Sequence, residues 1–471
     1  MQSVEYRSPI GVSQQELFAW HERDGAFERL VPPWEDICVI EKKGGIRDGD
    51  ETTLSVKLGP IRKKWVARHF GYEPPRKFQD EQVEGPFKSE VHTHLCLPDP
   101  DGAANRSILV DHIDYEPPLG AIGRLFASGM IRRSFDQTFL FRHRRMQRDL
   151  ARHARFASAG ALRIAISGAS GLIGTALKAF LRTGGHHVQV LVRHSPDRSK
   201  GEIQWDPVAG RIDGDALESV DAVVHLSGES LAAGRWTQER KQRFVESRLK
   251  STDLLSRTLA GLKKPPRVMV SASAIGMYGN RGDEILTESS PKGAGFLPDL
   301  CEKWEAASRP AIDGGIRVVH PRIGIVMSAR GGALATMLAP FMLGGGGVIG
   351  SGNQYMSWIS LDDLVYVMHE AIFDTELSGP VNAVAPNPVT NREFVKTLGR
   401  VIKRPTVLPL PAPAVKLAFG EMGEHLLLEG ARVSPARLES TGFAFAHPTL
   451  EDALRSELGR QRLPEGWGIV K

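Results

Sequence analysis

The sequence predicts an α/β protein centred on a doubly wound parallel sheet, with a smaller α+β domain before it and a short helical domain after it. Three observations support this prediction. A glycine-rich turn joins a strand-like run to a helix within residues 162–193. Strand and helix patterns then alternate up to residue 405, and strands in such an order pair in parallel. The first part instead shows short strand-like runs between two helices. We therefore divide the chain into residues 1–157, 158–405 and 406–471.

The composition is typical of a packed globular protein, with 41% hydrophobic and 24% charged residues. The net charge of +5 is small and both signs are spread along the chain, so we expect neither nucleic acid nor a membrane as a partner. The three cysteines, Cys38, Cys96 and Cys301, lack the paired spacing of a metal site, and the first residues lack a signal-peptide pattern. These features favour a reducing, cytoplasmic location. They leave the oligomeric state open.

The first 157 residues predict a helix, a sheet and a long closing helix. Ser13-Gln-Gln-Glu16 has capping-box spacing ahead of an apolar run. Strand-like runs follow at residues 35–41, 51–58, 64–72, 77–84, 89–97 and 107–115. The closing segment repeats apolar residues at helical spacing, namely Phe135, Phe139, Met146 and Leu150. We interpret the arginines between them, which include Arg145, as the solvated face of an amphipathic helix rather than as a nucleic-acid face.

The central motif is Gly168-Ala-Ser-Gly171-Leu-Ile-Gly174, which follows a buried strand at 162–167 and opens a helix at 172–183. Gly168 and Gly171 let the backbone turn tightly and approach a ligand, and Gly174 lets the helix lie close to the sheet. The helix N-terminus directs free N–H groups and a positive dipole end over this turn, where a pyrophosphate binds well. The motif therefore predicts a Rossmann sheet that binds a dinucleotide through Gly168, Ser170, Gly171, Leu172, Ile173 and Gly174.

The second strand, residues 187–193, ends on a base. A carboxylate at this position would bind the ribose 2′-hydroxyl of NAD. Arg193 stands there instead and Arg198 follows shortly after, and guanidinium groups suit the 2′-phosphate of NADP. We therefore predict NADP as the cofactor.

More candidate residues follow the ends of the next strands, because the strand ends at one edge of a parallel sheet form its ligand crevice. A buried strand at 221–226 precedes one group of polar residues, a long helix at 237–262 comes next, and a strand at 267–271 precedes another group. We expect these residues to contact the cofactor or the substrate. They are Ser227, Gly228, Glu229, Arg235, Ser271 and Ser273.

Residues 331–361 contain no charged side chain. Pro340 and the glycines at 344–347 would weaken a membrane helix, so we expect a buried helix and loop beside the ligand crevice. Beyond residue 405, prolines make a stiff connection, and residues 449–452 have helix-capping spacing. We expect a small helical domain there, without visible chemistry.

A set of motifs extends over residues 160–460, and includes Leu226-Ser-Gly-Glu-Ser230, Ser271-Ala-Ser-Ala-Ile-Gly-Met-Tyr-Gly279, Trp304-Glu305 and Pro321-Arg-Ile-Gly324. With these motifs the segment resembles the extended short-chain dehydrogenase/reductases. Among these enzymes, the segment resembles an atypical NAD-dependent epimerase group that is sometimes labelled a cell-division inhibitor. Nothing in these residues supports that label. The resemblance implies that Ser273 hydrogen-bonds a substrate oxygen. It implies that Tyr278 is structural but could reach the crevice.

Classical members of that superfamily use a tyrosinate whose pKa is lowered by a lysine four residues later. Here the residues four positions after the six tyrosines are Ile10, Arg76, Leu119, Gly282, Ile359 and Glu370, so no Tyr-x-x-x-Lys pair exists. Alignment on Glu305 places Leu297 and Cys301 where the pair belongs. Ser273 and Tyr278 remain as catalytic candidates, with Arg322 nearby. Each could equally belong to the scaffold.

The first third has motifs of its own at residues 27–34, 85–87 and 111–120, together with His92 and His94. It resembles the START-like, polyketide-cyclase type of ligand-binding domain (the SRPBCC superfamily). The resemblance implies a helix-grip fold that holds an apolar ligand between its sheet and its long helix. His92 and His94 share one face of a strand and could bind a metal or a ligand. Because the sequence offers no evident third ligand, we interpret them as satisfied polar residues.

Two classes of function stay open. The first is an NADP-dependent oxidoreductase or epimerase that acts on a small molecule through a non-standard proton donor. The second is a binding protein that holds NADP(H) and an apolar ligand, as a carrier or redox sensor with little turnover. The missing tyrosine–lysine pair favours the second class. The intact glycine turn and Ser273 favour the first, which we place ahead.

Overall fold

The computed structural model describes residues 1–118, 120–232 and 234–470, with the side chains of residues 120–127, 469 and 470 left out of the description. Leu119, which belongs to the motif at 111–120, lies outside the described residues. The chain divides into two compact units. Unit 1 comprises Met1–Ser158, Arg182–Gly185 and Ser456–Lys471, and unit 2 comprises Ala159–Leu181 and His186–Arg455. The division into three domains at residues 157 and 405 stays a prediction.

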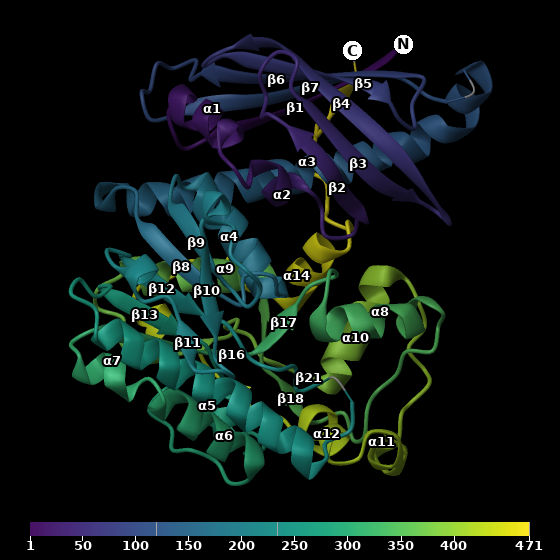
Figure 1. Ribbon diagram of the computed structural model, residues 1–471. Coiled ribbons are helices and arrows are strands. Elements are labelled where there is room, and N and C mark those ends of the chain that lie inside the picture. The colour runs from purple at the N-terminus through teal and green to yellow at the C-terminus, as the bar shows by residue number, and fades with distance from the viewer. Residues whose placement is uncertain (119, 233, 471) are drawn as a thin grey trace. The chain divides into compact units, whose positions relative to one another are not determined.

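Unit 1 is built on an eight-stranded antiparallel sheet (Figure 1). Its strand order is β2-β3-β4-β5-β6-β7-β1-β23. The predicted strands are all present, and β1, at the start of the chain, adds a strand that the turn signals did not reveal. The strands are β1 (Gln2–Ile10), β2 (Ile37–Lys43), β3 (Glu51–Leu58), β4 (Ile61–Glu73), β5 (Lys77–Glu84), β6 (Ser89–Pro98), β7 (Ser107–Glu116) and β23 (Ile469–Val470).

Three helices accompany this sheet: α1 (Gln14–Glu22), α2 (Ala26–Leu30) and the long α3 (Gly120–Arg155). The Ser13 hydroxyl caps α1 by accepting a hydrogen bond from the Glu16 backbone N–H, as the capping spacing predicted. α3 packs its apolar face, which includes Phe139 and Met146, against side chains of the sheet. The prediction of a solvated arginine face was wrong for Arg145. That side chain is buried because it lies over the Phe141 ring and donates to the Arg29 carbonyl.

Unit 2 is built on a nine-stranded sheet with the order β11-β10-β9-β8-β12-β13-β16-β14, in which β20 also pairs with β16. The pairs along β10-β9-β8-β12-β13-β16-β20 are all parallel, and only the short β11 runs antiparallel. This is the predicted Rossmann arrangement. Its strands are β8 (Arg163–Ser167), β9 (His187–Val192), β10 (Glu202–Asp206), β11 (Arg211–Ile212), β12 (Ala222–His225), β13 (Val268–Ser271), β14 (Ser273–Ala274), β16 (Arg317–Ile323) and β20 (Gly379–Ala383).

Helices cover both faces of this sheet (Figure 1). On one face, Ile164 and Ile166 of β8 pack with side chains of α4 (Leu172–Thr183) and α9 (Leu361–Phe373). On the other face, Ala165 packs with side chains of α5 (Gln238–Ala260) and α7 (Arg309–Asp313). Successive residues of β8 therefore face opposite layers, which is why residues 164–166 in the middle of this strand are all apolar rather than alternating.

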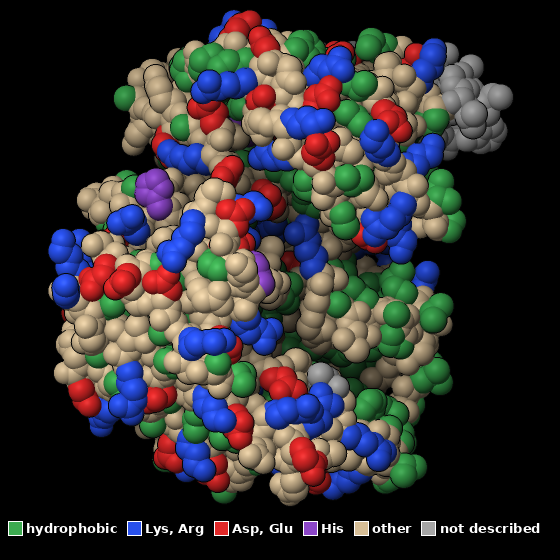
Figure 2. Space-filling view, in the orientation of Figure 1, with side chains coloured by type: hydrophobic (Ala, Val, Ile, Leu, Met, Phe, Trp, Pro, Cys, Tyr) green, Lys and Arg blue, Asp and Glu red, His purple; other side chains and the backbone are tan. Residues whose placement is uncertain are grey.

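The predicted buried helix in the uncharged stretch is α8 (Gly332–Met342), and the prediction was wrong about its burial. α8 buries only Leu334 and Phe341, whereas Met342 and the following Leu343 are 44% and 89% exposed. Figure 2 shows hydrophobic side chains gathered over α8 and over α11 (Ala412–Phe419). No helix in the described part of the chain is both long and apolar enough to cross a membrane.

The remaining elements of unit 2 are helices of at most 12 residues and strands of two or three residues. The predicted cap at Thr449 is present, because its hydroxyl accepts from the Asp452 backbone N–H. These elements are α6 (Phe296–Ala306), α10 (Asn391–Ile402), α12 (Glu421–Gly423), α13 (Ala436–Ser440), α14 (Leu450–Glu457), β15 (Ile285–Leu286), β17 (Ile325–Met327), β18 (Tyr355–Met356), β19 (Trp358–Ser360), β21 (Val389–Thr390) and β22 (Arg432–Val433).

Candidate functional site

The glycine turn between β8 and α4 lies directly against the segment that follows β12. Gly168 has φ +71°, and a Cβ there would lie 2.9 Å from the Leu226 carbonyl. A Cβ on Gly174 would lie 2.3 Å from the Gly168 carbonyl oxygen, so only glycine allows α4 to start this close to the turn. The Gly171 N–H donates to the same oxygen at 3.1 Å. The geometry thus gives a steric reason for the glycines at 168 and 174.

The residues predicted to contact a dinucleotide surround this turn. Ser170 and Gly171 are exposed, and Leu172 and Ile173 are half-buried at the start of α4. Ser227 follows β12, and its backbone nitrogen would lie 3.1 Å from a Cβ on Gly168. Gly228 is exposed and Glu229 half-buried. The backbone here remains accessible to a ligand, as a site for a pyrophosphate requires.

The three arginines predicted near the cofactor differ in their availability. Arg193 is exposed, and among the described residues its guanidinium has no hydrogen-bond partner. Arg198 is held in an ion pair with Asp213. Arg235 donates to the carbonyls of Leu417 and Ala418 at the end of α11. Only Arg193 is therefore ready to receive a phosphate without giving up another contact.

Ser273 lies in a buried polar cluster at the carboxyl end of the sheet. Its hydroxyl donates to Glu305 Oε1 at 2.6 Å, and Arg322 binds both oxygens of this carboxylate at 2.9 Å. Ser273 and Arg322 are register partners on the parallel strands β14 and β16, and Glu305 lies on α6. The Tyr278 hydroxyl donates to Asn382 Oδ1 at 2.6 Å and accepts from Arg322 Nη1 at 3.0 Å.

This arrangement distinguishes the two catalytic candidates. Tyr278, on the short helix η4 (Ile275–Tyr278), is fully buried, and burial raises the pKa of its phenol although the Arg322 charge opposes the shift. Its hydroxyl is occupied by two protein partners. Within the described residues, the Ser273 hydroxyl has one hydrogen-bond partner, the Glu305 carboxylate, which can take up a proton. Within this cluster, the Ser273–Glu305 pair is therefore better suited to exchange a proton than the Tyr278 phenol.

Leu297 and Cys301 lie on α6, where the alignment places the tyrosine and lysine of classical relatives. A Cβ on Gly276 would lie 3.5 Å from both Leu297 Cβ and Cys301 Sγ, so these side chains pack α6 against η4. Burial, with the Glu305 charge, raises the pKa of the Cys301 thiol to about 12. A thiol in this state is a poor nucleophile. Ser271, at the end of β13, is fully buried, and its hydroxyl has no hydrogen-bond partner in the described chain.

Sequence reasoning used Glu305 only to align the motif and did not predict its contacts. Two features of the sequence could have indicated the Glu305–Arg322 contact. They are an acidic residue on an otherwise apolar helix face and an arginine, Arg322, inside a buried strand. A buried arginine requires a counter-charge, and Glu305 was the acidic residue already aligned with the site.

Comparison with known proteins shows the family to which this chain belongs. The family model described as "NAD dependent epimerase/dehydratase family" matches residues 164–382, and a model for a domain of unknown function (DUF1731) matches residues 410–457. Epimerase family protein Mb2239 of Mycobacterium bovis is 47% identical over 291 residues, which cover 62% of this chain and 96% of that protein. Human epimerase family protein SDR39U1 is 37% identical over 297 residues, which cover 62% of this chain and 99% of that protein. The chain belongs to the NAD-dependent epimerase/dehydratase family.

Two solved structures agree with this family assignment. Human SDR39U1 (isoform 2) with NADPH superposes with a TM-score of 0.59 at 35% identity, covering 63% of this chain and 99% of that one. A nucleoside-diphosphate sugar epimerase from Corynebacterium glutamicum superposes with a TM-score of 0.78 at 33% identity, covering 98% of this chain and 91% of that one. The epimerase-family fold thus covers unit 2, and the second structure also extends over most of unit 1.

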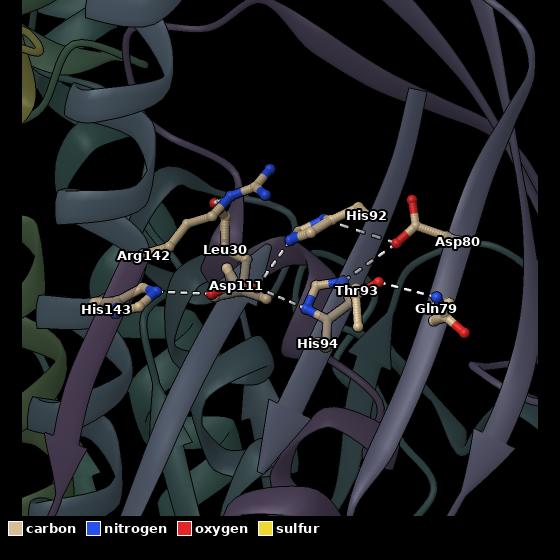
Figure 3. A network of polar contacts seen from close by, with 9 residues as sticks. All are labelled: Leu30, Gln79, Asp80, His92, Thr93, His94, Asp111, Arg142 and His143. Carbon is tan, nitrogen blue, oxygen red and sulfur yellow. Dashed lines mark hydrogen bonds and ion pairs between the residues drawn. The ribbon is translucent and has the colours of Figure 1, made fainter. Parts of the chain in front are cut away.

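In this epimerase-family chain, unit 1 carries a second cluster of polar residues, on the sheet face that α3 covers (Figure 3). His94 donates to Asp111 Oδ1 at 2.8 Å and to Asp80 Oδ2 at 3.1 Å. Burial would lower the pKa of His94, but these two hydrogen bonds outweigh it and raise the pKa to about 9. Burial would likewise raise the pKa of Asp80, yet its bond from His94 and the charge of His92 lower it to about 2. The prediction that these histidines have polar partners was correct, and the partners are carboxylates.

Proposed function

We propose that this family member is an NADP-dependent oxidoreductase or epimerase that acts on a small molecule without a tyrosine–lysine pair. The observation that carries the proposal is the bond from Ser273 to Glu305 at the carboxyl end of the sheet. The cluster lies one strand beyond the pair β12–β13, in which His225 and Ser271 are register partners. The cluster therefore lies at the carboxyl edge of the sheet, where the glycine turn also meets residues 226–229. An open parallel sheet has its ligand crevice at this edge.

The protein residues supply a route for the proton. A substrate hydroxyl that hydrogen-bonds to Ser273 Oγ can pass its proton to that oxygen while the serine proton moves to Glu305 Oε1. In the reverse direction the same two transfers protonate a substrate oxygen. Arg322 holds Glu305 in position throughout and keeps its charge compensated. Bound NADP would supply the hydride acceptor or donor.

The choice of NADP over NAD rests on Arg193, whose exposed guanidinium follows the end of β9. The structure of human SDR39U1 has been solved with NADPH, which supports the choice of NADP for the present chain. The likeness to the Corynebacterium glutamicum protein makes nucleoside-diphosphate sugars the first substrate class to test.

For unit 1, we propose a START-like (SRPBCC) helix-grip domain that binds a ligand between its sheet and α3. This proposal is supported by the antiparallel sheet and by the single 36-residue helix packed on one of its faces. We also propose a cytoplasmic location and domain boundaries at residues 157 and 405.

The test begins with mass spectrometry of the purified full-length chain to identify the cofactor that it retains. Titration with NADPH and NADH then gives the preference, and nucleoside-diphosphate sugars are screened for a substrate-dependent change in nicotinamide absorbance. We expect NADPH to bind more tightly and at least one substrate to be turned over. Tight NADPH binding without turnover of any substrate would instead favour the alternative function, a carrier or redox sensor.

A further inference from the structure

Three histidines of unit 1, His92, His94 and His143, contact the carboxylate of Asp111. Asp111 Oδ1 accepts from His92 Nε2 and from His94 Nδ1, both at 2.8 Å. The remaining ring nitrogens, His92 Nδ1 and His94 Nε2, both face Asp80 Oδ2, at 3.7 and 3.1 Å. Asp111 thus orients both imidazole rings through one nitrogen of each, and the other nitrogen of each ring faces the Asp80 carboxylate (Figure 3).

We propose that His92, His94 and Asp80 form a binding site for a divalent transition-metal ion such as Zn²⁺. One ligand atom from each residue lies within 4.8 Å of the others. Around a tetrahedral zinc ion with bonds of about 2.0–2.1 Å, neighbouring ligand atoms lie about 3.3 Å apart, close to the two distances to Asp80. Two imidazoles and one carboxylate are a ligand set typical of zinc and of non-haem iron. This site is independent of the dinucleotide site in unit 2.

Asp111 acts in this proposal as a second-shell carboxylate. Metal-bound histidines usually donate their other N–H to a carboxylate, which fixes the tautomer and the ring orientation. Asp111 does this for both rings, and His143 of α3 donates to its other oxygen at 2.6 Å. The sheet register supports the same geometry, since Asp80 is paired with His92 and Asp111 with His94 on neighbouring strands.

Aromatic packing holds the two rings in place before any ion binds. The Phe78 ring stacks on His94 with centroids 4.2 Å apart and planes 10° apart. Phe139 of α3 meets His92 edge-on, with centroids 5.2 Å apart. A site whose ligands are fixed by packing loses little conformational entropy when it binds.

The site has one open side. The Asp80 side chain is 23% exposed, whereas His92 and His94 are 8% and 11% exposed, so an ion can enter past Asp80. Three protein ligands leave a coordination position for water or for an oxygen atom of a ligand, as in catalytic rather than structural zinc sites.

The test is calorimetric titration of the untagged, metal-stripped full-length chain with zinc chloride, followed by the absorbance of the cobalt(II) form. We expect an equivalent of zinc that is lost in both His92→Ala and Asp80→Asn. Asp80 lies at the open edge of the cluster, and Asp80→Asn keeps the size of the side chain. Zinc binding by this variant can therefore be measured even if His92→Ala does not fold. Asp111→Asn should weaken the same equivalent by about 10- to 100-fold, because it removes the orienting acceptor.

His112→Ala is the matched control, because His112 follows Asp111 on β7 and faces the other side of the sheet, where it contacts Glu5. It should bind zinc like the native chain. The proposal is overturned if native protein binds no zinc in the micromolar range, or if Asp80→Asn and His92→Ala retain every equivalent. Circular dichroism of each variant without metal establishes that it is folded.

Discussion

Arg322 binds Glu305 at two points, with Nε 2.9 Å from Oε1 and Nη2 2.9 Å from Oε2. The two side chains are only 8% and 14% exposed. The same Oε1 accepts the hydrogen bond from Ser273, so this ion pair fixes the carboxylate on which the proposed proton route depends. Losing either partner should therefore affect both stability and function.

Arg322→Ala should destabilise the protein by about 3–5 kcal/mol, because it leaves the Glu305 charge buried without its partner. Urea unfolding followed by circular dichroism measures this. Lys292→Ala is the control, since Lys292 pairs with Asp299 and Glu302 on the exposed side of α6 and should cost less than about 1 kcal/mol. Equal losses for the two variants would contradict the assignment of a buried, structurally essential pair.

Gly174→Ala should weaken NADPH binding by tenfold or more, which is about 1.4 kcal/mol. The new Cβ would lie 2.3 Å from the Gly168 carbonyl oxygen and 2.7 Å from Ala169 Cα, so the turn must move away from α4. Fluorescence titration of NADPH measures the change. Gly214→Ala should bind NADPH like the native chain, because its Cβ would meet nothing closer than 3.5 Å.

The glycine turn also shows how much of the fold is encoded locally. The predicted helix at 172–183 coincides with α4 because a glycine turn precedes it and two glycines end it. The predicted strands at 51–58 and 77–84 coincide with β3 and β5 for a similar reason, since turn residues bound both. Such signals lie within a few residues of the elements that they define, so a single sequence is sufficient to find them.

The contacts of the candidate site are different, because they join residues that are distant in sequence. Glu305 and Arg322 are 17 positions apart on a helix and a strand, and His94 meets Asp80 and Asp111 on two other strands. No spacing rule connects such positions before the strand register is known. The sequence could therefore identify Ser273 and the His92–His94 pair, but not the carboxylates that complete both clusters.

Arg193→Asp should weaken NADPH binding about ten- to a hundred-fold, because an arginine–phosphate contact contributes about 1.5–3 kcal/mol. Parallel titrations with NADPH and NADH measure the change in preference. Arg198→Asp should have the smaller effect, since Arg198 is already paired with Asp213. Equal affinity of the native chain for both cofactors would refute the role given to Arg193.

Ser273→Ala should lower turnover about 10²- to 10⁴-fold while NADPH binding stays unchanged, because it interrupts the proton route to Glu305. Tyr278→Phe should act on stability instead, with a loss of about 1–3 kcal/mol, since it leaves Arg322 Nη1 and Asn382 Oδ1 without their partner. Turnover of the substrate found by the screen and urea unfolding separate the two effects. A double variant with undiminished turnover would exclude both residues from the mechanism.

His225, which is fully buried at the end of β12, should make the protein less stable in acid. Its Nδ1 lies 2.6 Å from Ser167 Oγ, and its Nε2 lies 3.1 Å from Thr252 Oγ1. Burial lowers the pKa of His225 to about 4, from about 6.5 in the unfolded chain. Between about pH 6.5 and about pH 4, His225 binds a proton in the unfolded state but not in the folded state. The free energy of unfolding therefore falls as the pH falls. Above about pH 7 this contribution is constant.

By pH 5 the loss from His225 alone should reach about 2 kcal/mol, since each pH unit below 6.5 costs about 1.4 kcal/mol. His225→Gln offers an amide to the same hydroxyls and has no proton to gain. The free energy of unfolding of this variant should be lower than that of the native chain at pH 7.5. The difference between the two should become smaller or vanish at pH 5. Urea unfolding at both pH values measures this, with hydrogen exchange of peptides from β8 and β12 to locate the effect in unit 2. A gap that stays constant or widens on acidification would show that His225 already carries its proton in the folded state.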